Sequence, residues 1–160
     1  MIALTWVRYF ATLPGLTRLL TAERYQVKPS KIWANLAVKD LDRTAAFYTK
    51  LGFKSNMSQP SNDLTSFCFG INDFIIHFFK QEKLEPAMGG KAADLTLGNE
   101  IIFSLSAESE EEVRQWSEDA EAAGGKIIKE AAHDENGYYY CVFADPEGHK
   151  FNVLLVGPGM

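Results

Sequence analysis

IWANLAVKDLDRTAAFYTKLGF, residues 32–53, contains the signals for a strand, a helix and the start of a second strand. Apolar side chains alternate over residues 32–38, and a period of two predicts a β-strand. Asp40 then supplies the side chain of a helix N-cap. Gly52 is placed to end that helix in the left-handed conformation. The expected order is therefore strand, helix, strand.

The pattern continues downstream and then begins again. Residues 64–70 and 74–79 are predicted strands, joined by a turn over residues 71–73 that is typical of a hairpin. A second strand–helix unit starts at residue 101, where Ser109 and Glu112 have the spacing of a capping box. Further strands are expected at residues 126–129, 138–143 and 150–156.

Both halves thus have the order strand, helix, strand, hairpin, about 70 residues apart. We expect an α+β domain of tandem βαβββ modules that forms a curved mixed sheet around a cleft. The predicted boundaries are an N-terminal extension over residues 1–30 and a domain over residues 31–157. Within the domain, module one is residues 31–80, the connection is residues 81–99 and module two is residues 100–157.

Composition excludes several classes of function. A net charge of −5 and a pI near 5.2 provide no basic surface for nucleic acid. Every apolar run is shorter than the roughly 18 residues of a membrane span. Cys68 and Cys141 lie in apolar runs typical of reduced thiols, so we expect a cytoplasmic protein. The sequence also has no phosphate-binding loop, serine-hydrolase elbow or Cys-x-x-Cys pair.

The extension differs from the rest of the chain. Its basic residues outnumber its acidic ones, and apolar residues are scattered among them. A targeting peptide is disfavoured because no small-residue cleavage site follows and Pro14-Gly15 interrupts a helix. A helical arm that docks on the domain or on a partner subunit, and a segment without a role, both stay open.

Three motifs follow one another along the domain: Asn35-Leu36-Ala37-Val38-Lys39-Asp40-Leu41, Phe47-Tyr48-x-x-Leu51-Gly52-Phe53 and Asp145-Pro146-Glu147-Gly148-His149. With the paired βαβββ pattern, the chain resembles the vicinal oxygen chelate superfamily of glyoxalases, bleomycin resistance proteins and extradiol dioxygenases. The resemblance covers residues 31–157. It implies the fold but not a reaction, because the chemistry of this fold varies widely.

The resemblance also implies a divalent metal held in the cleft at four positions. Counted from the motifs, these positions are Trp33, His77, Ile102 and Asn152. Only His77 is a good ligand, and a Zn, Fe or Mn site usually needs about three. A divalent ion (Zn, Ni, Mn or Fe) is therefore expected to bind weakly or not at all. A carboxylate from Glu85, Asp94 or Glu100 is one source of a replacement metal ligand.

Strand alternation gives the residues expected to line the cleft. If Ile76 and Phe78 face the helix, His77 faces the cleft as a ligand, a general base or a structural histidine. His133 and His149 are expected in exposed loops. The predicted cleft-lining residues are Trp33, Asn35, His77, Ile102, Ser104, Tyr139 and Asn152, and core packing is the competing interpretation for Trp33 and the tyrosines.

Two hypotheses about function follow from the resemblance. In the first, the protein is glyoxalase-like and binds a small polar metabolite, as a relative of lactoylglutathione lyases or dioxygenases with a degenerate metal site. In the second, it is a non-catalytic, bleomycin-resistance-like protein that sequesters a drug or metabolite. A third possibility is a cleft filled by its own side chains. The family resemblance also implies a homodimer, and neither nucleic acid nor membrane is an expected partner.

Overall fold

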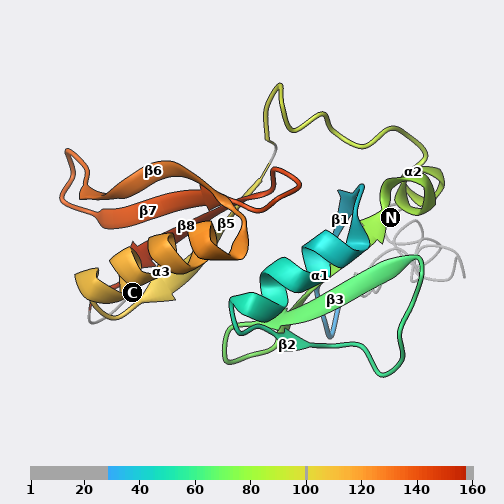
Figure 1. Ribbon diagram of the computed structural model, residues 1–160, viewed down its shortest axis with the longest axis horizontal. Helices are drawn as coiled ribbons and strands as arrows, with labels where there is room; N and C mark the ends of the chain where they lie inside the picture. The colour runs from blue at the N-terminus through green and yellow to red at the C-terminus, as the bar shows by residue number, and fades with distance from the viewer. Residues whose placement is uncertain (1–28, 100, 158–160) are drawn as a thin grey trace, which may run out of the picture. The chain divides into compact units, whose positions relative to one another are not determined.

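The computed structural model describes residues 29–99 and 101–157. The predicted extension, residues 1–30, lies almost wholly outside the described residues, as does Glu100. From Ile32 onward the chain forms one compact unit. Its elements are β1 (Trp33–Val38), α1 (Leu41–Lys50), β2 (Lys54–Ser55), β3 (Leu64–Phe69), β4 (Phe74–Lys80), α2 (Gln81–Met88), β5 (Ile102–Ala107), α3 (Glu110–Ala123), β6 (Lys126–His133), β7 (Tyr139–Ala144) and β8 (Lys150–Leu155) (Figure 1).

The strands form two mixed sheets of four strands each. Their orders are β1-β4-β3-β2 and β5-β8-β7-β6, so the second sheet repeats the topology of the first. In each sheet the first strand pairs in parallel with the last, and the other pairs are antiparallel. The tandem βαβββ fold is confirmed. Each module contributes one open sheet, and among the described residues no hydrogen-bonded ladder joins β1 to β5.

Local capping chemistry sets the ends of α1 and α3. The Asp40 carboxylate accepts a hydrogen bond from the Arg43 backbone N–H at 2.9 Å. The Ser109 hydroxyl likewise accepts from the Glu112 N–H at 3.1 Å. Gly52 and Gly124 have positive φ angles of 82° and 102°, as expected for helix ends. The sequence therefore predicted both helices correctly.

Helix α2 was not predicted. We expected a polar connection after β4, but residues 81–88 are helical despite Pro86 within them. Leu84 is buried on the β1 and β4 side of this helix, and Gly89 ends the helix with a φ of 69°. Packing of Leu84 and the left-handed cap at Gly89 both favour this short helix, which contains Pro86.

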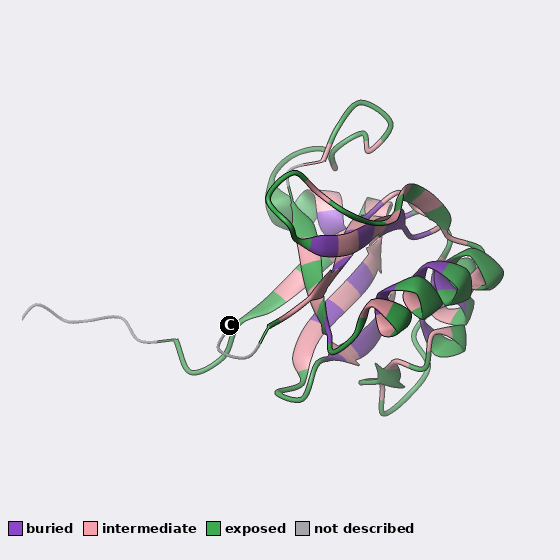
Figure 2. Cartoon of the chain, turned by 90° about the vertical axis from the view of Figure 1, so that its left-hand side faces the viewer, coloured by how far each residue is buried: buried purple, intermediate pink, exposed green. Residues whose placement is uncertain are grey.

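One aromatic core joins the two modules. Tyr48 of α1 stacks on Phe78 with ring centroids 4.5 Å apart and also contacts Phe151 of β8 at 6.0 Å. Phe151 stacks in turn on Phe103 and Phe143 within its own sheet, both at 5.4 Å. Buried residues therefore alternate with exposed or half-buried ones along the strands (Figure 2). The other face of each sheet carries polar residues.

Candidate functional site

A row of polar side chains crosses the open face of the first sheet. Asn35 on β1 is in register with His77 on β4, and His77 is in register with Ser66 on β3. Asn56, just beyond β2, extends the row by donating from its amide to the Ser66 hydroxyl at 3.4 Å. Since these residues alternate with the core residue Phe78 and its neighbours, the strand register alone brings them together.

His77 is the titratable residue of this row. Its ring is half-buried, and burial lowers its pKa, so the neutral imidazole is favoured. Its Nδ1 atom is buried and has no hydrogen-bond partner among the described residues. A buried polar atom without a partner is uncommon in folded proteins, so the hydrogen bonding of His77 is incomplete within the described residues.

Further apolar and polar groups lie on the same face as the row and on the second sheet. Trp33 lies on the same face as His77 and is 53% exposed, so its indole is open to a partner. On the second sheet Ile102 is 47% exposed, and Ser104 is exposed in register with Asn152 on β8. The Asn152 Oδ1 atom is buried and unpaired among the described residues, as is His77 Nδ1.

Tyr139 is placed differently from our expectation that it lines the cleft. It is buried on the helix side of β7, and its hydroxyl accepts a hydrogen bond from Arg114 of α3 at 3.1 Å. Strand alternation puts it with the core residue Cys141, because the two are two positions apart. Tyr140 takes the open face instead, where the Lys129 ammonium contacts its hydroxyl and its ring.

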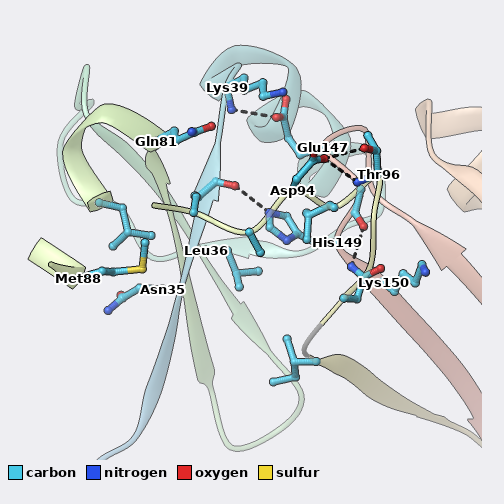
Figure 3. A pocket seen from close by; sticks show the side chains of 18 of the residues that line it. Asn35, Leu36, Lys39, Gln81, Met88, Asp94, Thr96, Glu147, His149 and Lys150 are labelled. Carbon is cyan, nitrogen blue, oxygen red and sulfur yellow. Dashed lines mark hydrogen bonds between the residues drawn. The ribbon is translucent and has the colours of Figure 1, made fainter. Parts of the chain in front are cut away.

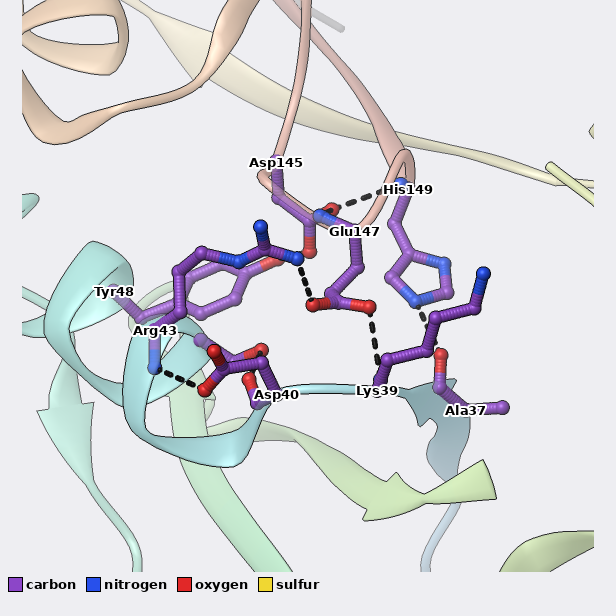
Figure 4. Close-up of polar contacts among 9 residues, drawn as sticks. Ala37, Lys39, Asp40, Arg43, Tyr48, Asp145, Glu147 and His149 are labelled. Atoms are coloured by element: carbon purple, nitrogen blue, oxygen red, sulfur yellow. Dashed lines mark hydrogen bonds and ion pairs between the residues drawn. The ribbon is translucent and has the colours of Figure 1, made fainter. Parts of the chain in front are cut away.

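The Asp145–His149 turn fastens module two to module one (Figure 4). The buried Asp145 carboxylate accepts a hydrogen bond from the Tyr48 hydroxyl of α1 at 2.8 Å. It also accepts hydrogen bonds from the backbone N–H groups of Glu147 and His149, both at 2.9 Å. Burial nevertheless raises the pKa of Asp145. The Asp145-Pro146-Glu147-Gly148-His149 motif therefore has a structural role at the junction of the modules.

His149 corrects a second expectation, because it is only 8% exposed rather than solvated. Its Nε2 atom lies 3.0 Å from the Ala37 carbonyl oxygen of β1. Nearby, the Glu147 carboxylate accepts from the Lys39 backbone N–H at 2.8 Å and pairs with Arg43 at 2.5 Å. The turn is buried because it packs on the other module, which spacing along the sequence does not reveal.

A pocket of about 450 Å³ lies where β1, α2, the connection and this turn meet, and we call it the seam pocket (Figure 3). Its apolar lining includes Leu36, Leu84, Met88, Leu95, Ile101 and Phe103. Its polar lining includes Asn35, Lys39, Asp94, Asn99, His149 and Lys150. Asn35 is the one predicted cleft residue among them. Sequence reasoning missed the others because the connection that brings many of them together has no strand or helix periodicity.

Comparisons with known proteins agree with this architecture. The Glyoxalase/Bleomycin resistance protein/Dioxygenase superfamily matches residues 32–153. The chain belongs to this superfamily. No curated protein sequence matches it.

Solved structures of the superfamily fold are similar over most of the chain. A hypothetical protein from S. aureus is 29% identical with a TM-score of 0.71, over 82% of this chain and 98% of that one. A lactoylglutathione lyase from Agrobacterium tumefaciens is 23% identical with a TM-score of 0.59, over 81% and 96%. A bleomycin-binding protein in complex with bleomycin is 18% identical with a TM-score of 0.54, over 81% and 100%. The last two likenesses show the fold alone.

The residues present do not fit the divalent metal that the superfamily often binds. Of the four matched positions, Trp33 and Ile102 have no donor atom for a metal, and Asn152 offers only a neutral amide. Among residues 29–99 and 101–157, no group of three His, Cys, Asp or Glu side chains could hold an ion. The carboxylates expected as replacement metal ligands act elsewhere: Glu85 accepts hydrogen bonds from Gln81 and Lys91 within or beside α2, and Asp94 bonds Thr96.

No helix in the described part of the chain has the length and apolar character needed to cross a membrane.

Proposed function

We propose that this superfamily member binds a small polar organic ligand, without metal, on the open face of the first sheet. The observation that carries the proposal is the orphaned His77 Nδ1 atom, which lies in a polar row flanked by the exposed indole of Trp33. A ligand that forms a hydrogen bond with this nitrogen and stacks on the indole would satisfy both groups. The function is then bleomycin-resistance-like binding of a drug or metabolite.

The missing metal ligands favour binding over catalysis. Lyases and dioxygenases of this superfamily depend on an ion that polarises the substrate, and three of the four matched positions here are poor or unable to hold one. The neutral state of His77 supports the second candidate, a lactoylglutathione lyase-like or dioxygenase-like enzyme, because a metal binds the neutral imidazole. That candidate requires further ligands from outside the described residues or from a second subunit.

We also propose a cytoplasmic compartment and a homodimer, and one feature supports each. Both cysteines are free thiols, which agrees with a reducing, cytoplasmic compartment. The exposed Trp33 and Ile102 are large apolar groups, and a second copy of the chain is a natural partner for them.

The deciding experiment measures metal content and ligand binding on the same samples. Wild type, His77→Ala and the control His133→Ala, which removes an exposed imidazole, are dialysed and reloaded with Zn, Ni, Mn and Fe before elemental analysis. Each is then screened against bleomycin and small metabolites by thermal shift. We expect no stoichiometric metal in any sample, and a ligand shift that His77→Ala alone removes.

Near-stoichiometric metal that is lost only in His77→Ala would overturn the proposal and establish the metalloenzyme candidate. A ligand shift of equal size in wild type and His77→Ala would show that the ligand does not bind at the polar row.

A further inference from the structure

The seam pocket meets the polar row of the open sheet face at Asn35 alone, because Asn35 belongs to both. Leu36 and Phe103 in its wall belong to the helix-facing sides of β1 and β5, opposite the row that contains His77. Its volume of about 450 Å³ lies within the range of roughly 300–1,000 Å³ that is usual for small-molecule sites. His77 and Trp33 do not line it.

The connection is held in place over this pocket at both ends. At its start the Glu85 carboxylate accepts hydrogen bonds from the Lys91 ammonium at 2.9 Å and the Ala92 N–H at 3.2 Å. At its end the Asn99 amide donates to the Gly148 carbonyl at 3.2 Å. Between them Leu95 packs so closely on Gly148 that a Cβ there would lie 3.2 Å from the leucine Cβ. The wall is thus built by specific contacts.

Two residues of the pocket lining present hydrogen-bond acceptors, and one of these acceptors is buried without a partner within the described residues. A carbonyl can only accept, so the Asn99 nitrogen must face Gly148, which leaves its buried Oδ1 unpaired. By the same reasoning the His149 Nε2 carries the proton shared with the Ala37 carbonyl. The second ring nitrogen, Nδ1, is then an acceptor in the neutral tautomer. The buried Asn99 Oδ1 therefore favours a ligand with an O–H or N–H group, and His149 Nδ1 is a second acceptor for such a ligand.

The charge of the lining favours an anion. Lys39 and Lys150 line the pocket, and neither is part of an ion pair in the described portion of the chain. The Glu147 carboxylate forms an ion pair with the Arg43 guanidinium. Asp94 is the remaining carboxylate of the described lining, and the hydrogen bonds from Thr96 and the nearby Lys39 charge lower its pKa. Two ammonium groups thus accompany one negative charge.

We propose that the seam pocket is a second ligand site, for an amphipathic organic acid with an apolar or aromatic body and at least one hydrogen-bond donor. The body packs against Met88 and Leu84, the donors pair with Asn99 and His149, and the anion lies near Lys39. Figure 3 shows Met88 on one side of the hollow and His149 on the other. This site contains neither His77 nor Trp33, and it shares only Asn35 with the polar row.

The test uses 8-anilinonaphthalene-1-sulfonate, a fluorescent dye with an aromatic body, an N–H donor and a sulfonate anion. Full-length protein is titrated with the dye, and saturable binding near one dye per chain is expected. Lys39→Glu and Met88→Asp change exposed or half-exposed lining residues and should each weaken binding about tenfold. Lys126→Glu, a charge reversal on an exposed lysine of β6, should change binding less than about twofold.

Further controls separate this site from the polar row and from misfolding. Trp33→Ser and His77→Ala should leave the dye affinity unchanged, and every variant should keep the wild-type melting temperature within a few degrees. In ¹⁵N NMR spectra, the dye should shift the amides of Ala92, Ala93 and His149. The proposal is overturned if the dye fails to saturate, or if Trp33→Ser weakens binding while Lys39→Glu and Met88→Asp do not.

Discussion

Two adjacent glycines at the end of α3 serve different physical purposes. Gly124 has a φ of 102° and open space around it, so it is needed for its backbone conformation. Gly125 is needed for space, because a Cβ there would lie 2.8 Å from the Ala144 carbonyl oxygen and 2.9 Å from both the Ala120 carbonyl oxygen and the Phe47 ring. The close approach of α3 to β7 and α1 depends on this second position.

We expect Gly125→Ala to lower the free energy of unfolding by about 2–3 kcal/mol, because backbone atoms block the new methyl group. Gly124→Ala should cost only about 1 kcal/mol, the strain of a left-handed residue. Urea unfolding monitored by circular dichroism measures both. Equal losses for the two variants would mean that packing at Gly125 relaxes freely.

The burial of His77 predicts a pH dependence. Since its folded pKa is lowered, the folded state binds this proton less readily than the unfolded state, where the pKa is about 6.5. The stability contributed by neutral His77 is complete above that pH and is lost as the pH falls below it. We therefore expect the melting temperature of wild type to fall further than that of His77→Gln when the pH is lowered from about 7.5 to 5.5. Parallel losses in the two proteins would contradict the lowered pKa, and His133→Gln is the matched control.

At the scale of elements, the connection is ordered by side chains rather than by a sheet. Glu85 accepts hydrogen bonds from Lys91, Gln81 and the Ala92 N–H, which together lower its pKa to about 2. A single carboxylate thus ties the start of the connection to α2. Asp94 similarly orders a turn by bonding the N–H and hydroxyl of Thr96.

Glu85→Gln should make the connection easier to cleave, because the neutral amide holds the Lys91 ammonium less strongly. Limited trypsin digestion followed by mass spectrometry measures the cleavage rate after Lys91. Glu82→Gln, in the same helix, is the control because Glu82 forms no ion pair in the described residues. Cleavage at the same rate in both variants would show that the wall of the seam pocket does not depend on Glu85.

At the scale of the whole molecule, the modules are joined by the aromatic core and by the Asp145–His149 turn. The hydrogen bond from Tyr48 to Asp145 is buried on both sides, and burial together with the Asp145 carboxylate raises the pKa of Tyr48 well above its usual value. The phenol therefore stays protonated and donates.

We expect Tyr48→Phe to lower the free energy of unfolding by about 1–3 kcal/mol, because Asp145 keeps its burial but loses a donor. The loss should be smaller at acidic pH, where a protonated Asp145 is less costly to bury. Denaturant titrations at two pH values test this. A constant loss at both would show that the charge of Asp145 does not contribute.

The open sheet faces lead to a prediction about assembly. Trp33 and Ile102 leave apolar surface uncovered in the single chain, so we expect a homodimer. Sedimentation velocity of the full-length protein at micromolar concentration measures this, and Trp33→Ser should shift the distribution toward monomer. A wild-type monomer at that concentration would contradict the prediction.

The sequence by itself determined the elements whose causes are local. Period-two strands, the Asp40 and Ser109 caps and the glycines after α1 and α3 act within a few residues, so their patterns can be read without knowing the fold. The same alternation correctly assigned His77 to the face opposite Phe78. The motifs also identified the superfamily.

Only the tertiary structure decided what depends on distant partners. In the sequence of β7, the residues that share a face with Tyr139 are as apolar as those that share a face with Tyr140. Packing of β7 against α3 therefore decides which of the two phenols is buried. His149 is buried because module one covers its turn. The seam pocket exists because the connection crosses that same turn. Each of these contacts joins residues far apart in the chain, and no local pattern encodes such a contact.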